Sequence, residues 1–363
     1  MSTEPSTWSR LSDLEIAIDE VRTEPRSLKT ASGFVRRTTV VEFRTADGAI
    51  GRGEDVTWDA KVQLARSASD LEPLRGFRGT LAEASAAFAQ VTERSAPGYL
   101  RWALESAALD LALVRDGRSL GEVVGREPRP VRFCVSLGLG AKPDAGESLA
   151  ALDEVLAADP DARFKVDFSE HFTPRTAERL AASGRVDVLD LKAHDRGDFQ
   201  GPAPDAALYA ALAEALPDAW LEDPLLEGEA RAALAGAIER VTWDAPLDGL
   251  AWLTGLEREP RAVNIKPSRF GTLAELFAVL DHCAARGIAC YGGGQFELGV
   301  GRRQIQELAA LWYPDGPNDV SPVAYHPRPL AADAPRSPLA VRGGHGFGGS
   351  SDLPLGEGSL HIA

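Results

Sequence analysis

Carboxylates stand at the ends of several short apolar runs in the second half of this 363-residue chain. Three of them, Asp190, Glu222 and Asp244, follow runs rich in the residues that favour β-strands. Carboxylates brought together at neighbouring strand ends repel one another unless a cation lies between them. Hard oxygen ligands of this kind suit Mg²⁺, so the three residues predict a Mg²⁺ site.

Lysine is scarce in the chain, yet it occurs beside these carboxylates. Of the 39 lysines and arginines only six are lysine, and Lys165, Lys192 and Lys266 lie in or next to short strand-like runs that also carry or adjoin carboxylates. A lysine close to a divalent cation can lose its proton and act as a base, which an arginine cannot do. The order lysine, three carboxylates, lysine therefore predicts metal-assisted proton transfer.

Alternating strands and helices from about residue 130 would position these side chains. Strand-like runs occur at 131–137, 163–168, 186–191, 219–222, 240–244, 262–266 and 288–292. Helical stretches lie at 146–158, 174–183, 205–216, 228–238, 272–286 and 301–312. This alternation predicts a parallel sheet, and seven or eight units predict a (β/α)8-type barrel. A doubly wound sheet is the alternative, but no Gly-x-Gly-x-x-Gly follows the first strand.

The region before the barrel has a different pattern, typical of an α+β domain. Asp47-Gly48 between two apolar runs predicts a hairpin, and 80–116 has helical periodicity. A polar loop is expected from Thr23 to Arg37. The expected organisation is an α+β capping domain at 1–127, a barrel at 128–326, and a tail at 327–363 that packs on the capping domain.

Strand geometry predicts which charged side chains share a face. Because side chains alternate along a strand, Lys165 and Asp167 point the same way, as do Asp190 and Lys192. The carboxyl ends of barrel strands converge on one mouth, where active sites are built. The charged residues are therefore expected to meet there.

Composition narrows the class of partner. A net charge of −15 argues against nucleic acid or an anionic membrane surface as a partner. The three cysteines lack metal-ligand spacing and suit a reducing, cytoplasmic setting. The first residues contain neither a basic flank nor an apolar stretch, so neither a signal peptide nor a membrane span is expected.

These motifs together resemble the enolase superfamily, and the resemblance covers most of the chain. The motifs are Ala103-Leu-Glu-Ser-Ala-Ala-Leu-Asp110, the lysine of the second strand, the Asp/Glu/Asp series, Asn264-Ile-Lys-Pro-Ser, and Gly292-Gly-Gly-Gln-Phe-Glu-Leu-Gly-Val-Gly-Arg. The pattern is most similar to the muconate-lactonizing subgroup, which includes o-succinylbenzoate synthases and dipeptide epimerases.

The resemblance implies a shared first step, in which a lysine removes the proton α to a metal-bound carboxylate and the metal stabilises the enediolate. It implies Asp190, Glu222 and Asp244 as Mg²⁺ ligands and Lys266 as a base. Lys165 matches the first lysine of the family's Lys-x-Lys, which supports the substrate carboxylate. The resemblance also makes a homo-oligomer plausible.

Two positions depart from the family pattern. The second lysine of Lys-x-Lys is Asp167 here, and the usual Asp-x-Asn of the third strand is Asp190-Leu-Lys192. We expect Lys192 and Asp167 to form an exchanged ion pair across neighbouring strands, with Lys192 as a candidate second acid or base. Racemisation needs groups on both faces of the substrate, so the departures favour a lyase or dehydratase over a racemase.

Further residues are candidates for substrate binding. Gln295 and Glu297 lie in the Gly-rich seventh-strand segment, and Arg36 belongs to the basic stretch 24–37, where the family's capping loop closes over substrate. His171 and His194 follow strand ends, but neither has an obvious catalytic partner.

Two other classes of function stay open. Loss of the second-strand lysine is compatible with a catalytically silent family member that serves as a binding protein. A Schiff-base aldolase that uses a barrel lysine is a third alternative, and it would not require a metal.

Overall fold

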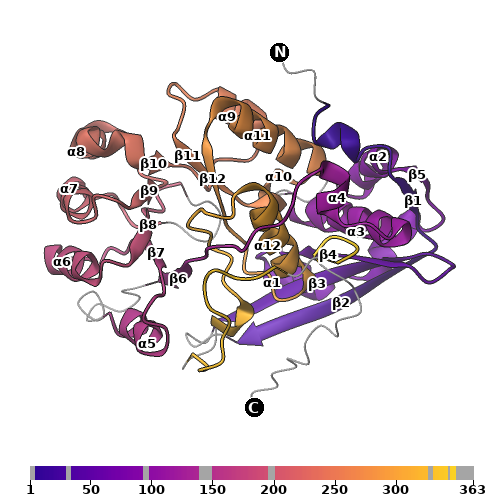
Figure 1. Cartoon of the computed structure of the whole chain (residues 1–363), viewed down its shortest axis with the longest axis horizontal. Helices are drawn as coiled ribbons and strands as arrows, with labels where there is room; N and C mark the ends of the chain where they lie inside the picture. Colours follow the sequence, from indigo (N-terminus) through magenta and orange to yellow (C-terminus); the bar gives the residue numbers. More distant parts are fainter. Residues whose placement is uncertain are drawn as a thin grey trace.

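The computed structural model describes residues 5–29, 34–92, 98–138, 149–194, 201–325, 330–341 and 344–348. An antiparallel sheet with its helices lies beside a barrel of parallel strands (Figure 1). Buried apolar side chains of both parts form one large cluster. Among the described residues, no helix combines the length and the apolar character needed to cross a bilayer.

The N-terminal part is built on two antiparallel sheets. The larger consists of β2 (Glu20–Lys29), β3 (Val35–Arg44) and β4 (Ile50–Asp55), and β1 (Glu15–Ala17) pairs with β5 (Arg78–Thr80). The hairpin expected at Asp47-Gly48 joins β3 to β4. The polar loop expected at 23–37 is wrong for most of its length, because β2 and β3 pair from Glu20↔Arg44 to Lys29↔Val35. Residues 30–33 of that stretch lie outside the described residues.

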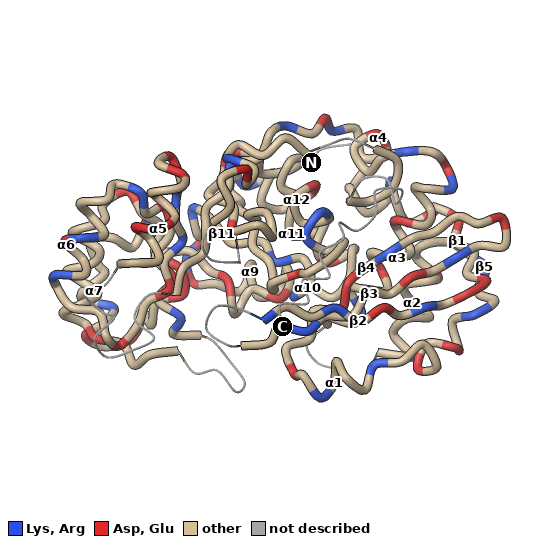
Figure 2. Tube along the Cα trace, turned by 90° about the horizontal axis from the view of Figure 1, so that it is seen from below, with Lys and Arg blue, Asp and Glu red and all other residues tan. Residues whose placement is uncertain are grey.

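Ion pairs explain why this polar stretch forms strands. Arg22 pairs with Glu20 and Arg26 with Glu24 along β2, while Glu42 of β3 receives Arg52 from β4. Acidic and basic residues accordingly lie side by side on this sheet (Figure 2). Alternate positions carry charges toward solvent, and the apolar positions of β3 face the helices.

Helices accompany this sheet, and the first and the third of them pack directly on it. They are α1 (Ala60–Ala65), α2 (Leu81–Thr92), α3 (Tyr99–Asp116) and α4 (Leu120–Val124), with 3₁₀ turns at Trp8–Arg10 and Ala68–Leu74. The longest, α3, lies directly on β4, where a Cβ at Gly53 would come within 2.0 Å of the Ala103 carbonyl oxygen. Only glycine allows this approach.

The barrel strands follow in the expected order. They are β6 (Val135–Gly138), β7 (Phe164–Asp167), β8 (Val186–Asp190), β9 (Trp220–Glu222), β10 (Val241–Thr242), β11 (Ala262–Ile265) and β12 (Ala289–Gly292). Strands β6 to β10 form one parallel sheet, and β11 pairs in parallel with β12. The Asn264 amide donates to the Trp243 carbonyl, and Asn318 and Asp319 bridge to Phe133 and Gly293, which closes the barrel. The predicted (β/α)8-type barrel with an α+β N-terminal domain is thus confirmed.

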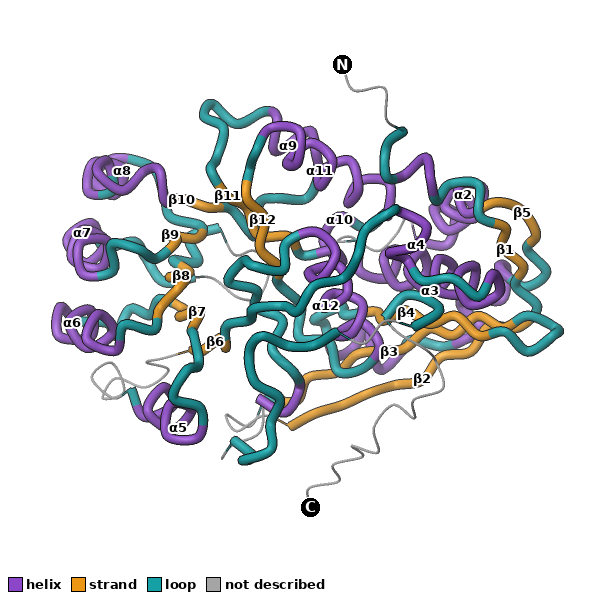
Figure 3. The backbone as a smooth tube through the Cα atoms, in the orientation of Figure 1, coloured by secondary structure: helices purple, strands orange, loops and turns teal. Residues whose placement is uncertain are grey.

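Helices outside the strands complete the barrel (Figure 3). They are α5 (Ala150–Ala158), α6 (Pro174–Ser183), α7 (Ala206–Ala215), α8 (Gly228–Ala233), α9 (Leu250–Thr254), α10 (Pro267–Phe270), α11 (Leu273–Arg286) and α12 (Val300–Trp312), with 3₁₀ turns at Ala235–Arg240 and Val323–Tyr325. Local signals fix several ends. Thr173 caps α6 ahead of Pro174, and the left-handed Gly184 ends it.

Residues 344–348 return to the N-terminal part. Phe347 is fully buried, and its ring meets Trp102 of α3 edge-on with the centroids 6.3 Å apart. Its amide donates to Asp110 Oδ1 at 2.7 Å. Burial raises the pKa of Asp110 to about 7. Residues 344–348 thus contact α3, whereas the packing of the whole tail on the N-terminal part stays a prediction.

Replacement of Phe347 tests how much this contact stabilises the chain. Phe347→Ala removes a fully buried ring, and loss of such a side chain lowers the free energy of unfolding by about 3–5 kcal/mol. Urea unfolding followed by circular dichroism measures the change. The control is Leu64→Ala in α1, which is 69% exposed and should change stability by less than about 0.5 kcal/mol. Equal effects of the two variants would contradict a structural role for the 344–348 segment.

Candidate active site

Three buried carboxylates meet at the carboxyl ends of the barrel strands. Asp190 ends β8, Glu222 ends β9, and Asp244 follows β10 by two residues. One oxygen from each of the three lies within 4.8 Å of the others, and all three residues are buried. The sequence-based expectation that they converge is therefore confirmed. We call these residues the acidic trio.

Lysines from the flanking strands contact the acidic trio. Lys165 Nζ, on β7, lies 3.1 Å from Asp190 Oδ2 and also binds Glu222 Oε1. Lys266 Nζ, after β11, lies 2.7 Å from Asp244 Oδ2. The two lysines expected at the site thus approach the trio from the two ends of the strand series.

Arginine also takes part, which the sequence pattern did not indicate. Arg269 of α10 binds both the side chain and the backbone carbonyl of Asp244. Pro267 begins this short helix directly after Lys266, and the turn brings Arg269 back to the strand ends. The one sequence signal for this contact is that Arg269 stands three residues after Lys266, which is close enough for both to reach the same strand end.

The neighbouring cations set the ionisation of two trio members. Burial alone would raise the pKa of both Asp190 and Asp244. For Asp190 the attraction of Lys165 overcomes burial, and for Asp244 the attraction of Arg269 does so. Both carboxyl groups therefore have pKa values below their usual range and are ionised.

Glu222 and Lys165 form the most buried pair of the site. Burial raises the pKa of Glu222 well above its usual value, although Lys165 opposes the shift. The pKa of Lys165 is raised well above its usual value because attraction to Asp190 and Glu222 outweighs its burial. Lys165 is therefore held as a cation, which makes it a better partner for a carboxylate than a proton acceptor.

Glu222 is further held by two uncharged partners. Asn264 Nδ2 donates to Glu222 Oε2 at 3.0 Å, and the Tyr291 hydroxyl donates to the same oxygen. Thr242 shares the Tyr291 hydroxyl at 2.6 Å. Asn264 belongs to the Asn264-Ile-Lys-Pro-Ser motif, so its place at the site is expected. Tyr291 lies in a strand, and nothing in the local sequence indicates that it contacts a carboxylate.

Lys192 and Asp167 form the ion pair that the sequence led us to expect. Lys192 Nζ lies 3.2 Å from Asp167 Oδ1 and 2.8 Å from Asp190 Oδ2. Lys192 does not face Asp167 through alternation of side chains along a strand, because β8 ends at Asp190. Instead, Lys192 has a left-handed backbone, with φ of 53°, that turns its side chain toward Asp167. Gly201 packs on this turn, where a Cβ would lie 1.8 Å from the Lys192 carbonyl oxygen. A left-handed non-glycine residue costs about 1–2 kcal/mol, and such strain concentrates at functional sites.

The segment after β12 is held by the N-terminal part. Arg36 is buried and donates to the carbonyls of Val56 at 2.6 Å, Gln295 at 2.8 Å and Thr57 at 3.0 Å. Its guanidinium also stacks on Trp58, 4.2 Å from the ring centroid. Arg36 therefore orders the 295–296 backbone from across the junction of the two parts.

The other two candidates for substrate binding lie in the same segment. Gln295 Oε1 accepts from Trp58 Nε1 at 2.6 Å. Glu297 Oε1 accepts from the Gln295 amide at 2.6 Å, and its Oε2 lies 3.5 Å from Arg302. Contact of these residues with a substrate stays a prediction.

Glu54 of β4 is a further residue that sequence reasoning missed. Its buried carboxylate accepts from the amides of Leu298, Gly299 and Gly301 at the start of α12. The positive end of the helix favours a carboxylate there. The only sequence signal for Glu54 is an acidic residue that follows Gly-Arg-Gly in a strand. Its partner Leu298 is 244 residues away, so the sequence does not indicate the contact.

The two histidines lie apart from the acidic trio. His194 Nε2 lies 3.0 Å from the Pro224 carbonyl oxygen, and its ring meets Trp243 edge-on. His171 lies 3.8 Å from Glu170. Within the described residues, neither histidine joins the groups around the trio.

The donor set fits a hard divalent cation. Three carboxylates from neighbouring strands supply oxygen atoms at mutual distances suited to one ion, and two of them are ionised. Each carboxylate has about four lone-pair sites, so it can bind a cation and keep its lysine or arginine partner. Asp190, Glu222 and Asp244 are therefore the residues that could hold a metal.

Comparison with known proteins places the chain by sequence and by fold. The sequence matches the family described as Domain of unknown function (DUF8230), with its N-terminal domain at residues 9–123 and its C-terminal domain at residues 127–327. No curated protein matches the sequence.

Solved structures of the enolase superfamily share the fold at low sequence identity. A member from Listeria innocua has a TM-score of 0.67 at 18% identity, covering 93% of this chain and 95% of its own. A dipeptide epimerase from Methylococcus capsulatus, complexed with Mg ion, has a TM-score of 0.63 at 20% identity over 82% and 88%. A muconate cycloisomerase from Pseudomonas fluorescens has a TM-score of 0.64 at 19% identity over 92% and 96%. The fold suggested by the sequence motifs is confirmed.

The role of Arg36 in the junction is testable. Arg36→Lys keeps the charge but loses the forked donors, so several buried carbonyls lose their partner. The free energy of unfolding should fall by about 2–3 kcal/mol, as for other hydrogen bonds to charged groups. Chemical denaturation measures it. Arg37→Lys at the neighbouring half-buried position is the control, and a comparable loss there would contradict the role of Arg36.

Proposed function

Since the chain belongs to the DUF8230 family and has the enolase-superfamily fold, we propose that it is an enzyme that removes the proton α to the carboxylate of a small substrate with the help of Mg²⁺. The acidic trio, with lysines approaching from both ends of the strand series, carries this proposal. Elimination by a lyase or dehydratase is the favoured outcome, and isomerisation is the related one.

Asp190, Glu222 and Asp244 would hold the cation. Mg²⁺ bound there would polarise the substrate carboxylate and stabilise the negative charge that develops after proton loss. The Mg ion of the Methylococcus capsulatus dipeptide epimerase, which has the same fold, supports this assignment.

The lysines would divide the remaining work. Lys266 Nζ would accept the α-proton, and its 2.7 Å contact with Asp244 keeps it beside the trio. Lys165, held as a cation, would bind the substrate carboxylate. Gln295, Glu297 and the segment ordered by Arg36 would line the substrate side.

Lys192 would serve as the second acid or base. Asp167 and Asp190 together orient its Nζ, and its left-handed backbone aims it at the trio. In an elimination Lys192 would protonate the leaving group. An epimerase or racemase that uses Lys192 on the opposite face is the alternative reaction. A catalytically silent binding protein is the alternative without turnover, because Asp167 replaces a lysine.

The setting is proposed to be the cytoplasm, since Cys134, Cys283 and Cys290 are all free thiols. A homo-oligomer is proposed by analogy with the superfamily. The substrate is a small carboxylate, and neither nucleic acid nor a membrane is proposed as a partner.

Deuterium exchange at the α-carbon tests the lysine roles. With Mg²⁺ and a panel of small carboxylates in D₂O, Lys266→Ala should lower the exchange rate by about 10²–10⁴-fold, the usual contribution of a general base. Lys192→Ala should lower product formation, whereas Lys61→Ala at an exposed position should change nothing. Proton NMR follows both exchange and product.

Each alternative has its own result in this experiment. Unchanged turnover in Lys192→Ala would favour a single-base mechanism, and inversion at the α-carbon without elimination would favour an epimerase. Absence of exchange across the panel, despite metal binding, would favour the silent protein. Trapping by borohydride without metal would indicate a Schiff-base enzyme.

Metal binding can be tested without turnover. At about 100 times its Kd, Mg²⁺ should stabilise the folded chain by about 2.7 kcal/mol, and EDTA should reverse the rise in Tm. Glu222→Gln should abolish most of that rise. Asp187→Asn on the same strand as Asp190 is paired with Arg163 outside the trio and should keep it. An equal Mg²⁺ response in wild type and Glu222→Gln would contradict the metal assignment.

A further inference from the structure

Left-handed backbone occurs at three described residues other than glycine, and all three follow barrel strands. Lys192 stands two residues after β8, Asp223 directly after β9, and Phe296 four residues after β12. Such strained backbone persists only where the surrounding contacts hold it, and it concentrates at functional sites. Asp223, with φ of 50°, is the strained residue that directly follows a member of the acidic trio, Glu222.

Asp244 is the trio member that the hydrogen-bond ladder of the sheet does not hold. Asp190 and Glu222 end their strands and are partners in the register of β8 and β9. Strand β10 ends at Thr242, so Asp244 lies two residues beyond the last position that pairs with β9. The buried amide of Asp244 therefore needs a partner from outside the ladder.

The carboxylate of Asp223 supplies that partner. Asp223 Oδ1 accepts from the Asp244 amide at 2.8 Å, and Oδ2 accepts from the Ala245 amide at 2.7 Å. Asp223 is only 1% exposed, so these bonds are shielded from water. In the extended backbone of a strand, the residue after Glu222 would point to the opposite face. The left-handed turn is thus what brings the Asp223 carboxylate to the end of β10.

The backbone of Asp223 connects the same strand ends. Its amide donates to the Thr242 carbonyl at 3.0 Å, and its carbonyl accepts from the Ala193 amide at 3.0 Å. Ala193 lies three residues after Asp190, and Thr242 lies two residues before Asp244. One residue therefore links the segments that carry all three members of the acidic trio.

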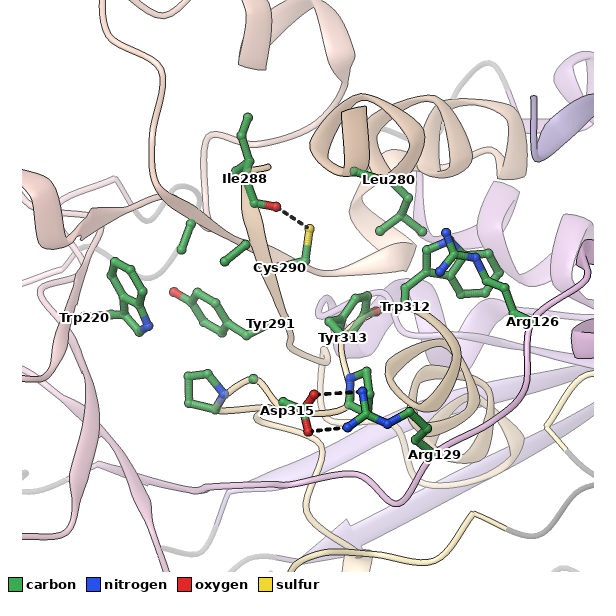
Figure 4. A pocket seen from close by; sticks show the side chains of 16 residues that line it. Arg126, Arg129, Trp220, Leu280, Ile288, Cys290, Tyr291, Trp312, Tyr313 and Asp315 are labelled. Atoms are coloured by element: carbon green, nitrogen blue, oxygen red, sulfur yellow. Dashed lines mark hydrogen bonds and ion pairs between the residues drawn. The ribbon is translucent and has the colours of Figure 1, made fainter. Parts of the chain in front are cut away.

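Other residues hold the remaining groups of the trio. Tyr291, on β12 (Figure 4), donates its hydroxyl to Glu222 Oε2. Arg269 donates to the backbone carbonyl and to the side chain of Asp244. An arginine has only donors, so it cannot bind an amide N–H. The amide side of Asp244 thus depends on the carboxylate of Asp223.

We propose that Asp223 is a positioning residue of the metal site, which fixes Asp244 relative to Asp190 and Glu222 and thereby makes the site select Mg²⁺ over Ca²⁺. This role rests on the Mg²⁺ site proposed above. Mg²⁺ demands nearly ideal octahedral geometry with short bonds, whereas Ca²⁺ accepts irregular coordination by flexible ligands. A ligand whose backbone is fixed on both sides therefore favours the smaller ion.

Calorimetric titration of the full-length protein with Mg²⁺ and with Ca²⁺ tests this role. Asp223→Gly keeps the left-handed backbone without strain and removes both acceptors. Mg²⁺ affinity should fall by about 10–100-fold, the usual effect of losing a group that orients a metal ligand. Ca²⁺ affinity should fall about tenfold less, because Ca²⁺ tolerates a displaced ligand. The ratio of the two affinities is the readout, since the loss of one negative charge weakens the binding of both divalent ions alike.

Asp223→Asn is the conservative variant. Asparagine tolerates a left-handed backbone, and its side-chain oxygen can accept from one of the two amides. The ratio of the affinities should therefore lie between those of the wild type and Asp223→Gly. Because Asp223→Asn keeps the size of the side chain, it decides the question if Asp223→Gly does not fold. Asp218→Asn, at an exposed position before β9, is the control and should leave the ratio unchanged.

Other results overturn the role of Asp223. Equal losses of Mg²⁺ and Ca²⁺ affinity in its variants would show that Asp223 contributes only charge or stability, and the Mg²⁺ site would stand without it. Unchanged Mg²⁺ affinity in both variants would also exclude the role. If the wild type binds no Mg²⁺, or if Glu222→Gln binds it equally well, the metal assignment itself fails and the role of Asp223 fails with it.

Discussion

The burial of three carboxylates at one end of the barrel is the constraint on which the rest of the structure depends. Ionised groups removed from water must be paired, because uncompensated burial costs far more than a fold can supply. Lys165, Lys192, Lys266 and Arg269 supply the positive charge, and they come from three separate stretches of the chain. The order of the barrel strands thus decides which cations lie beside the three carboxylates. Because these carboxylates need positive charge near them, a divalent cation suits the site.

Buried backbone groups at the junction of the N-terminal part and the barrel also require hydrogen-bond partners. Side chains from the antiparallel sheet bond the backbone of the Gly-rich segment after β12. Arg36 donates to its carbonyls and Glu54 accepts from its amides, both from the antiparallel sheet. The sheet therefore fixes the position of Gln295 and Glu297 relative to the trio. Arg36 and Glu54 are both buried against the segment after β12. The antiparallel sheet therefore holds this segment in place and does more than cover the mouth of the barrel.

Lys192 and Asp167 show how one departure from a family pattern is accommodated. An aspartate in place of a second-strand lysine would add a fourth negative charge to the mouth. The lysine that compensates it comes from the next strand and reaches it only through a left-handed turn, which Gly201 covers closely. The Lys192–Asp167 pair is neutral in sum, and its ammonium group comes from the turn after β8 instead of from β7.

The sequence alone determined the β/α alternation, the barrel and the convergence of the trio, because strand ends follow from local pattern. It also indicated the Lys192–Asp167 pair, but the left-handed turn that brings Lys192 to Asp167 was decided by the tertiary structure. It failed for β2, where ion pairs to neighbouring residues override a polar composition typical of loops. Only the tertiary structure decided that Arg269 binds Asp244, that Tyr291 reaches Glu222 and that Glu54 caps α12. Tyr291 and Glu222 are 69 residues apart and Glu54 and Leu298 are 244 apart, so no local pattern encodes those contacts. They arise from closure of the barrel and from docking of the sheet, which bring distant polar groups into the same dry space and require them to pair.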